Sequence, residues 1–213
     1  MHAPPPGAKA IDFGCAEGKL LNSLQDAGWE TYGIEPSTAV AFERHRRLDV
    51  PPADGSFDLA ILHHVLEHMA NPLDVLRQLA GSLREGAVLF ISVPRFDRIA
   101  QHGDFRYCVN GVNHPVAFTE AALRSLLARA GFEIAARLDA PELDRALTKG
   151  QPLRLRLLAR RTSAPPASAA APLGPARHAL AAYRRAHLPL PVRAAHVLPL
   201  RLRGGWLQWT LTR

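Results

Sequence analysis

The chain has 213 residues, of which 47% are hydrophobic, and this suits one domain with a packed core. No apolar run approaches the roughly 20 residues needed to cross a bilayer, and the first six residues have neither the basic nor the apolar region of a secretory signal. Two cysteines, Cys15 and Cys108, do not make a disulfide framework. These features argue against a membrane-spanning or disulfide-stapled protein and indicate the reducing cytoplasm.

The charge is distributed unevenly along the chain. Residues 1–144 contain all 19 acids and 13 Lys or Arg, a net charge of −6, whereas residues 145–213 contain 13 Lys or Arg and no acid, so the whole chain carries +7. Two interpretations stay open. An anionic partner binds the C-terminal third, or its arginines are only solvated.

The first predicted elements are a strand at residues 9–13, a helix at 17–27 and a second strand at 31–34. A glycine-containing turn, residues 14–18, lies between the first strand and the helix, and Glu35 follows the second strand. Glycine allows the backbone to approach a ligand, and the helix directs its first N–H groups at it. An acid at the tip of the next strand can accept both hydroxyls of a ribose. The segment therefore predicts a nucleoside site.

The glycine turn also indicates which nucleoside binds. A dinucleotide site needs G-x-G-x-x-G, but here Ala16 replaces the middle glycine and Glu17 would repel a diphosphate. The turn therefore argues against NAD, FAD and ATP and favours a ligand that has a ribose but no phosphate.

The rest of the chain to residue 160 continues to alternate between helices and strands. A third strand must be short or absent, because only 22 residues separate Glu35 from Asp58. The predicted ranges are a helix at 38–45, a short strand within 46–50, a strand at 57–62, a helix from 72 to about 83, a strand at 87–93, a long loop at 94–118, a helix at 119–130, and strands at 132–138 and 153–160. Alternation of this kind predicts an α/β fold.

Four segments resemble one enzyme family. Residues 11–18, I-D-F-G-C-A-E-G, resemble motif I of the class I S-adenosylmethionine-dependent methyltransferases, whose usual form is D-x-G-C-G-x-G. Residues 54–62 resemble the family's entry into strand four, and 86–94 resemble its strand five. Residues 63–68 resemble the L-E-H segment of the ubiquinone-biosynthesis O-methyltransferase group. The resemblance implies a Rossmann-like, doubly wound, mostly parallel sheet of six or seven strands with helices on both faces.

The resemblance also assigns a cofactor, S-adenosyl-L-methionine, with S-adenosyl-L-homocysteine as product. It implies that Glu35 binds the ribose, that the glycine turn lies under the methionine moiety, and that an acid near strand three, of which Asp49 is the only local candidate, contacts the adenine. The expected cofactor-binding residues are Asp12, Gly14, Cys15, Ala16, Gly18, Glu35, Pro36, Asp49, Leu62 and His63. Cys15 can be interpreted as a reactive thiol, but a packing role in the turn is the preferred interpretation.

Methyl transfer to oxygen or nitrogen needs an aligned acceptor and a base for its proton. Four residues are the catalytic candidates: His64, Glu67, His68 and His114. In the resembling family the residue matching His64 faces the substrate. The same four side chains can instead line the pocket or fix the loop by hydrogen bonds.

A metal is the further alternative for these four residues. Some relatives hold a divalent metal with E-x-x-E-H and a later histidine, and here His64 stands for the first glutamate. The set can bind zinc, manganese or iron, and suits magnesium less. A divalent metal is not favoured.

The sequence therefore predicts a methyltransferase acting on a small-molecule acceptor, at oxygen. A nucleic-acid methyltransferase that uses the basic tail is an alternative, although the N-P-P-Y tetrad of base-amino methyltransferases is absent from residues 93–96. A non-catalytic, cofactor-binding partner subunit is another. We expect a methyltransferase domain at 1–161, an Ala/Pro-rich linker at 162–175 and a basic C-terminal extension at 176–213. Residues 173–213 are expected to cover the acceptor site.

Overall fold

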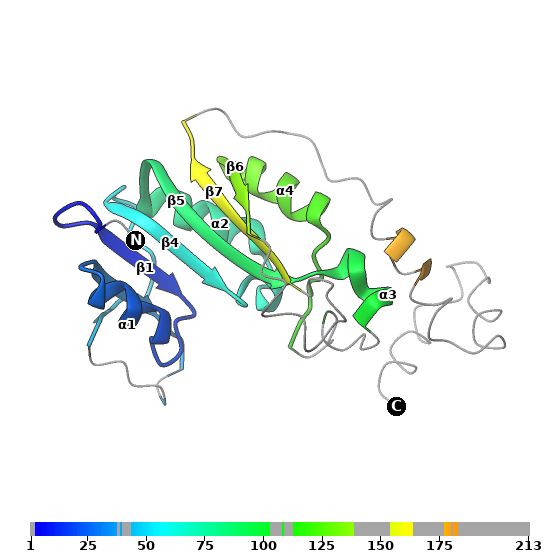
Figure 1. Ribbon diagram of the computed structural model, residues 1–213, viewed down its shortest axis with the longest axis horizontal. Helices are drawn as coiled ribbons and strands as arrows, with labels where there is room; N and C mark the ends of the chain where they lie inside the picture. The colour runs from blue at the N-terminus through cyan, green and yellow to red at the C-terminus, as the bar shows by residue number, and fades with distance from the viewer. Residues whose placement is uncertain are drawn as a thin grey trace.

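The computed structural model describes residues 3–37, 39, 44–102, 108, 113–138, 154–163, 177–179 and 181–182. Its centre is a seven-stranded sheet with the order β3-β2-β1-β4-β5-β7-β6 (Figure 1). The strands are β1 (Lys9–Phe13), β2 (Glu30–Ile34), β3 (Arg46–Arg47), β4 (Phe57–His63), β5 (Leu83–Pro94), β6 (Phe132–Arg137) and β7 (Arg154–Arg161). The first five pair in parallel, and β7 is antiparallel to both β5 and β6. The predicted doubly wound fold is confirmed.

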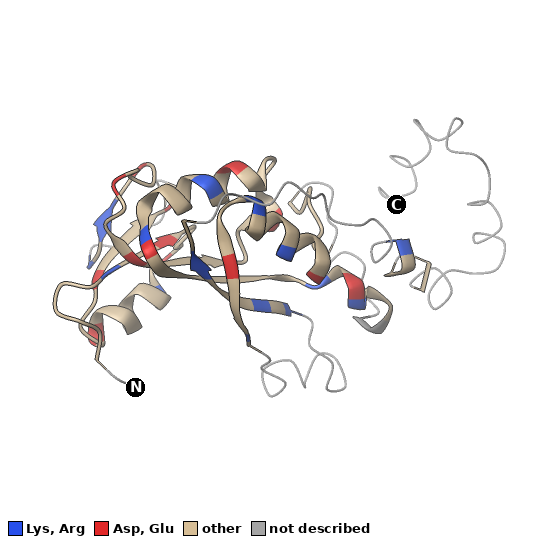
Figure 2. Ribbon diagram, turned by 90° about the horizontal axis from the view of Figure 1, so that it is seen from above, with Lys and Arg blue, Asp and Glu red and all other residues tan. Residues whose placement is uncertain are grey.

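Helices cover both faces of this sheet. They are α1 (Lys19–Asp26), α2 (Pro72–Ser82), α3 (Ile99–His102) and α4 (Glu120–Arg129), with short 3-10 turns η1 (Leu66–His68) and η2 (Phe96–Arg98). α1 packs on β1 and β2, whereas α2 and α4 lie together on the opposite face over β5 and β6 (Figures 1 and 2). α4 begins where the Thr119 hydroxyl accepts a hydrogen bond from the N–H of Ala122.

Side chains alternate between the two faces along β5 and β7. Leu89 and Ile91 of β5 and Leu155 and Leu157 of β7 are fully or almost fully buried, in one cluster with the apolar residues of α2 and α4. The intervening residues, such as Ser92 of β5, therefore lie on the face away from α2 and α4. This alternation decides which side chains reach the site at the carboxyl ends of the strands.

Several predicted boundaries need correction. β5 begins at Leu83 rather than at residue 87, and η2 and α3 lie within the predicted loop 94–118. Residues 44–45 form a turn and a bend rather than the end of a helix, and the rest of the predicted helix, apart from residue 39, lies outside the described residues. The short third strand is confirmed at two residues, Arg46–Arg47.

The proposed linker and the basic extension lie almost wholly outside the described residues, which there include only 162–163, 177–179 and 181–182. Within the described part of the chain, no helix has both the length and the apolar character that crossing a membrane requires.

Candidate active site

The glycine turn after β1 has alternating left-handed residues. Gly14, Ala16 and Gly18 have φ angles of 77°, 46° and 72°. Glycine adopts these angles freely, but alanine is strained there. The turn is held to β2, because the N–H groups of Gly14 and Cys15 both donate to the carbonyl of Ile34, at 2.7 and 3.2 Å. Ala16 therefore fits the expected loop, although its backbone is strained.

Glu35 closes this turn from the end of β2. Its Oε2 accepts a hydrogen bond from the N–H of Ala16 at 3.0 Å, and its Oε1 accepts one from the N–H of Ser37 at 2.9 Å. Arg47 of β3 donates to the backbone carbonyls of Glu35 and Ser37, at 2.5 and 3.0 Å. Because a carboxylate oxygen can accept more than one hydrogen bond, Glu35 is able to shape the turn and still accept from a ligand.

Asp12 lies under the turn as a buried carboxyl group. It is 3% exposed, and its Oδ1 has no hydrogen-bond partner in the described structure. Burial, followed by the charge of Glu35, raises the pKa of Asp12 to about 7. A cationic group arriving beside Asp12 would therefore stabilise its ionised form.

Cys15 lies beside Asp12 and is only 6% exposed. Burial is the largest cause that raises the pKa of its thiol to about 12, and the charges of Asp12 and Glu35 add to it. A thiol that stays protonated is a poor nucleophile. This favours the packing interpretation of Cys15 over the reactive one.

The other expected cofactor residues are less uniform in position. Pro36 is exposed beside Glu35, and Gly18 is the left-handed residue before α1. Asp49 is exposed two residues after Arg47, whose strand partner is Gly33, so Asp49 lies at the same edge of the sheet as Glu35. The side chain of Leu62 is fully buried in the core, so this residue can offer a ligand only its backbone.

The segment after β4 has an unusual backbone at His64, whose φ is 57°. Its N–H donates to the carbonyl of Ser92 at 2.9 Å. Its Nδ1 lies 3.0 Å from Oε1 of Glu67, which is 1% exposed. A carboxylate can only accept, so this contact assigns the proton to Nδ1 and leaves Nε2 as an acceptor. Nε2 is buried and has no hydrogen-bond partner among the described residues.

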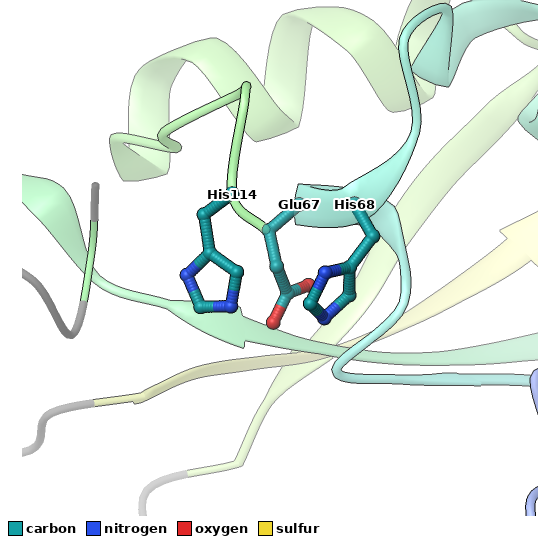
Figure 3. A group of neighbouring side chains, drawn as sticks. All are labelled: Glu67, His68 and His114. Carbon is teal, nitrogen blue, oxygen red and sulfur yellow. The ribbon is translucent and has the colours of Figure 1, made fainter. Parts of the chain in front are cut away.

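Glu67 also belongs to a second group, with His68 and His114. One ligand atom from each of the three lies within 4.8 Å of the others, and Figure 3 shows the side chains side by side. The rings of His68 and His114 are 4.6 Å apart, and Nδ1 of His68 is hydrogen-bonded to the carbonyl of Asn113. The structure thus brings together three of the four expected residues, and one carboxylate with two imidazoles can hold a transition metal. His64 lies at the edge of this group of three, and its Nδ1 is hydrogen-bonded to Glu67.

Three residues near the candidate site were not predicted from the sequence: Ser92, Arg154 and Arg156. His63 of β4, which was predicted, is paired with Ser92 of β5, and Ser92 is paired with Arg156 of β7. Arg154 lies two residues before Arg156. Partial desolvation and the charges of His64, Arg154 and Arg156 lower the pKa of His63 to about 4. Only the antiparallel register of β7 brings these arginines to His63, and nothing in the local sequence specifies that register.

Comparisons with known proteins show the family of the chain. The profile of a family described as a methyltransferase domain matches residues 2–137. A protein of Streptomyces fradiae, an uncharacterized 37.1 kDa protein in transposon TN4556, is 31% identical over 111 residues, or 44% of this chain and 32% of that protein. The ubiquinone biosynthesis O-methyltransferase of Xanthomonas campestris pv. campestris is 28% identical over 103 residues, or 41% of this chain and 43% of the relative. The chain thus spans less than half the length of these relatives.

A solved structure supports the fold. The S-adenosylmethionine dependent methyltransferase from Mesorhizobium loti superposes with a TM-score of 0.60 at 20% sequence identity, covering 73% of this chain and 92% of that one. At this identity the likeness shows the fold alone.

Proposed function

The chain belongs to the methyltransferase-domain family, and we propose that it transfers the methyl group of S-adenosylmethionine to an oxygen of a small-molecule acceptor. One contact carries the proposal. Gly14 of the glycine turn packs against Val65, the residue that follows His64. The turn expected to hold the methyl donor is therefore fixed beside the histidine expected to act on the acceptor.

The residues in and around the glycine turn have the chemical groups that the cofactor needs. Glu35 offers oxygens to the ribose hydroxyls, and Asp49 lies at the same edge for the adenine. Asp12 is a buried carboxyl whose Oδ1 has no hydrogen-bond partner among the described residues, and its charge would stabilise the ammonium group of the methionine moiety. Glu17 is exposed. Its charge would repel a phosphate group but does not oppose S-adenosylmethionine, which carries no phosphate.

His64 acts as the general base in this proposal. When bound, S-adenosylmethionine supplies a methyl group on a positively charged sulfur. Nε2 of His64 takes the proton of the acceptor hydroxyl as the oxygen bonds to the methyl carbon, and the carbon–sulfur bond breaks with its electrons on sulfur. Glu67 holds the imidazole in the required tautomer and stabilises its charge after it takes the proton.

Transfer to oxygen is supported by the relative of Xanthomonas campestris, which is an O-methyltransferase. The ability of Glu67, His68 and His114 to hold a metal provides an alternative way to activate the same hydroxyl. We assign this methyltransferase domain to residues 1–161, with 162–175 as a linker and 176–213 as a basic extension.

Calorimetric titration tests the proposal. S-adenosylmethionine and S-adenosylhomocysteine are titrated into the wild type and into Glu35→Ala. We expect micromolar binding that Glu35→Ala weakens by about 1–3 kcal/mol, the scale of a lost charged hydrogen bond. Glu30→Ala, an exposed glutamate at the start of β2, is the matched control and should bind as the wild type does. Absence of binding by the wild type would favour a non-catalytic scaffold.

A further inference from the structure

The carboxyl ends of β4 and β5 and the beginning of β7 form one continuous edge of the sheet. His63, Ser92 and Arg156 are partners across these three strands, so their side chains lie on the same face. Arg154 pairs with Pro94 and lies two residues from Arg156, on that face as well. Ligands of open α/β sheets bind at this edge. We call these four residues, His63, Ser92, Arg156 and Arg154, the row. It begins beside His64 and runs away from the glycine turn.

Two members of the row are polar and buried. Ser92 is 0% exposed, and its hydroxyl has no hydrogen-bond partner among the described residues. Arg156 is only 7% exposed. A buried hydroxyl without a partner costs free energy, so its presence beside a buried guanidinium indicates a polar ligand.

The charge of the row is positive. Arg154 and Arg156 are permanently charged. Desolvation, followed by the charges of His64, Arg154 and Arg156, lowers the pKa of His63 to about 4 and keeps its ring neutral near pH 7. The carboxylate that opposes this effect is that of Glu67, which is bonded to His64. Arginine presents a planar fork that matches carboxylate and phosphate oxygens. In a poorly hydrated setting such an interaction is stronger than at the surface.

We propose that the methyl acceptor carries a carboxylate or phosphate group, which Arg156 binds together with Arg154 and the hydroxyl of Ser92. This inference rests on the proposed methyl transfer and specifies its substrate class. Adjacent strands are about 4.8 Å apart, so β7 lies roughly 10 Å from β4. An extended arginine and an acceptor about the size of one ring bridge this span. The anionic group at β7 then places the acceptor hydroxyl toward Nε2 of His64.

Binding of small anions tests this assignment without knowledge of the acceptor. Benzoate, phenyl phosphate and the neutral benzamide are titrated into the full chain, with and without saturating S-adenosylhomocysteine, and the histidine ring signals are followed by NMR. We expect benzoate or phenyl phosphate to bind at least tenfold more tightly than benzamide and to shift the signals of His63. A preference for benzoate indicates a carboxylate, and a preference for phenyl phosphate indicates a phosphate.

Matched variants locate the site. Arg156→Gln should weaken the preferred anion at least tenfold, Arg156→Lys should weaken it less, and Ser92→Ala should weaken it severalfold. Arg160→Gln removes the same charge from an exposed residue farther along the same face of β7 and should have no effect. If Arg156→Gln fails to fold by thermal melting, Ser92→Ala and Arg156→Lys still decide the matter.

Three outcomes would overturn the inference. They are equal binding of benzamide and the anions, equal loss in Arg156→Gln and Arg160→Gln, and absence of anion binding in the wild type. Failure of the proposed function is distinguishable, because S-adenosylhomocysteine then fails to bind while the anion titration without it still reports on Arg156. If S-adenosylhomocysteine binds and the anions do not, only the inference fails.

Discussion

Gly14 and Val65 approach each other so closely that no side chain fits between them. A Cβ atom on Gly14 would lie 2.5 Å from Cγ2 of Val65, far inside a normal contact. Val65 follows His64 directly, so the same contact fixes the turn after β1 and the segment after β4. The positions of the expected donor and of the expected base are therefore coupled through one glycine.

We expect Gly14→Ala to destabilise the fold and to weaken S-adenosylmethionine binding. Gly7→Ala is a matched control, because Gly7 has a similar φ, 73° against 77°, but nothing within 4 Å of the added Cβ. The left-handed backbone destabilises both variants by about 1–2 kcal/mol, and the clash destabilises Gly14→Ala by about 1–3 kcal/mol more. Urea denaturation measures the difference. Equal losses in the two variants would contradict the steric role of Val65.

Asp12 makes folding stability depend on pH. Its pKa is raised from 3.8 to about 7, so between these values the folded protein holds a proton that the unfolded chain has released. The stability contributed by the protonated form is complete below about pH 4 and is lost as the pH rises through 7. We expect Asp12→Asn to remove this loss and to be more stable than the wild type at pH 8, as measured by urea denaturation across pH. Parallel pH profiles of the two proteins would refute the assignment.

The same carboxyl group should make cofactor binding pH-dependent. If the ammonium of S-adenosylmethionine stabilises ionised Asp12, affinity rises as the pH increases through 7, and protons are released on binding at pH 6. Calorimetry in buffers of different ionisation enthalpy measures this release. Asp12→Asn should release fewer protons, and an unchanged release would separate Asp12 from the cofactor.

The contact between His64 and Glu67 predicts one tautomer. ¹⁵N NMR should show the proton of His64 on Nδ1, and Glu67→Gln should populate the other tautomer, because an amide can donate to Nδ1. His45, bonded to Thr31 and Asn22, is an internal control whose signals should not change.

With an accepted substrate, His64→Ala should lower turnover about 10²–10⁴-fold and leave S-adenosylhomocysteine affinity unchanged.

Chelation separates the base from a metal at Glu67, His68 and His114. If His64 activates the acceptor alone, dialysis against EDTA should leave turnover unchanged. If EDTA abolishes turnover, and added zinc or manganese restores it in the wild type but not in His68→Ala, the activation is assigned to a metal instead.

Local patterns predicted where the elements of the first half of the candidate site lie. The range of β1 was predicted as residues 9–13 and is Lys9–Phe13, because an apolar run bounded by glycine is a strong local signal. Glu35 and the glycine turn lie together as predicted, since β1 and β2 are neighbours joined by a short helix. The roles assigned to these residues stay predictions.

Non-local pairing explains what the sequence did not predict. β5 begins at Leu83 because Leu83 pairs with Phe57 of β4, although Arg84, Glu85 and Gly86 interrupt the apolar pattern. The left-handed residue His64 donates its N–H to the carbonyl of Ser92, 28 positions away. The secondary-structure propensities of individual residues do not reflect such non-local contacts.

The antiparallel direction of β7 has a consequence for the order of folding. The half of the site that includes the glycine turn, Glu35 and His64 is encoded by the first 64 residues, whereas Arg154 and Arg156 come from the last strand of the sheet. During synthesis, the part expected to receive the donor can assemble before the part expected to select the acceptor has left the ribosome. The row from His63 to Arg156 is completed only when β7 inserts between β5 and β6, so the proposed acceptor-binding part of the site is the last part expected to form.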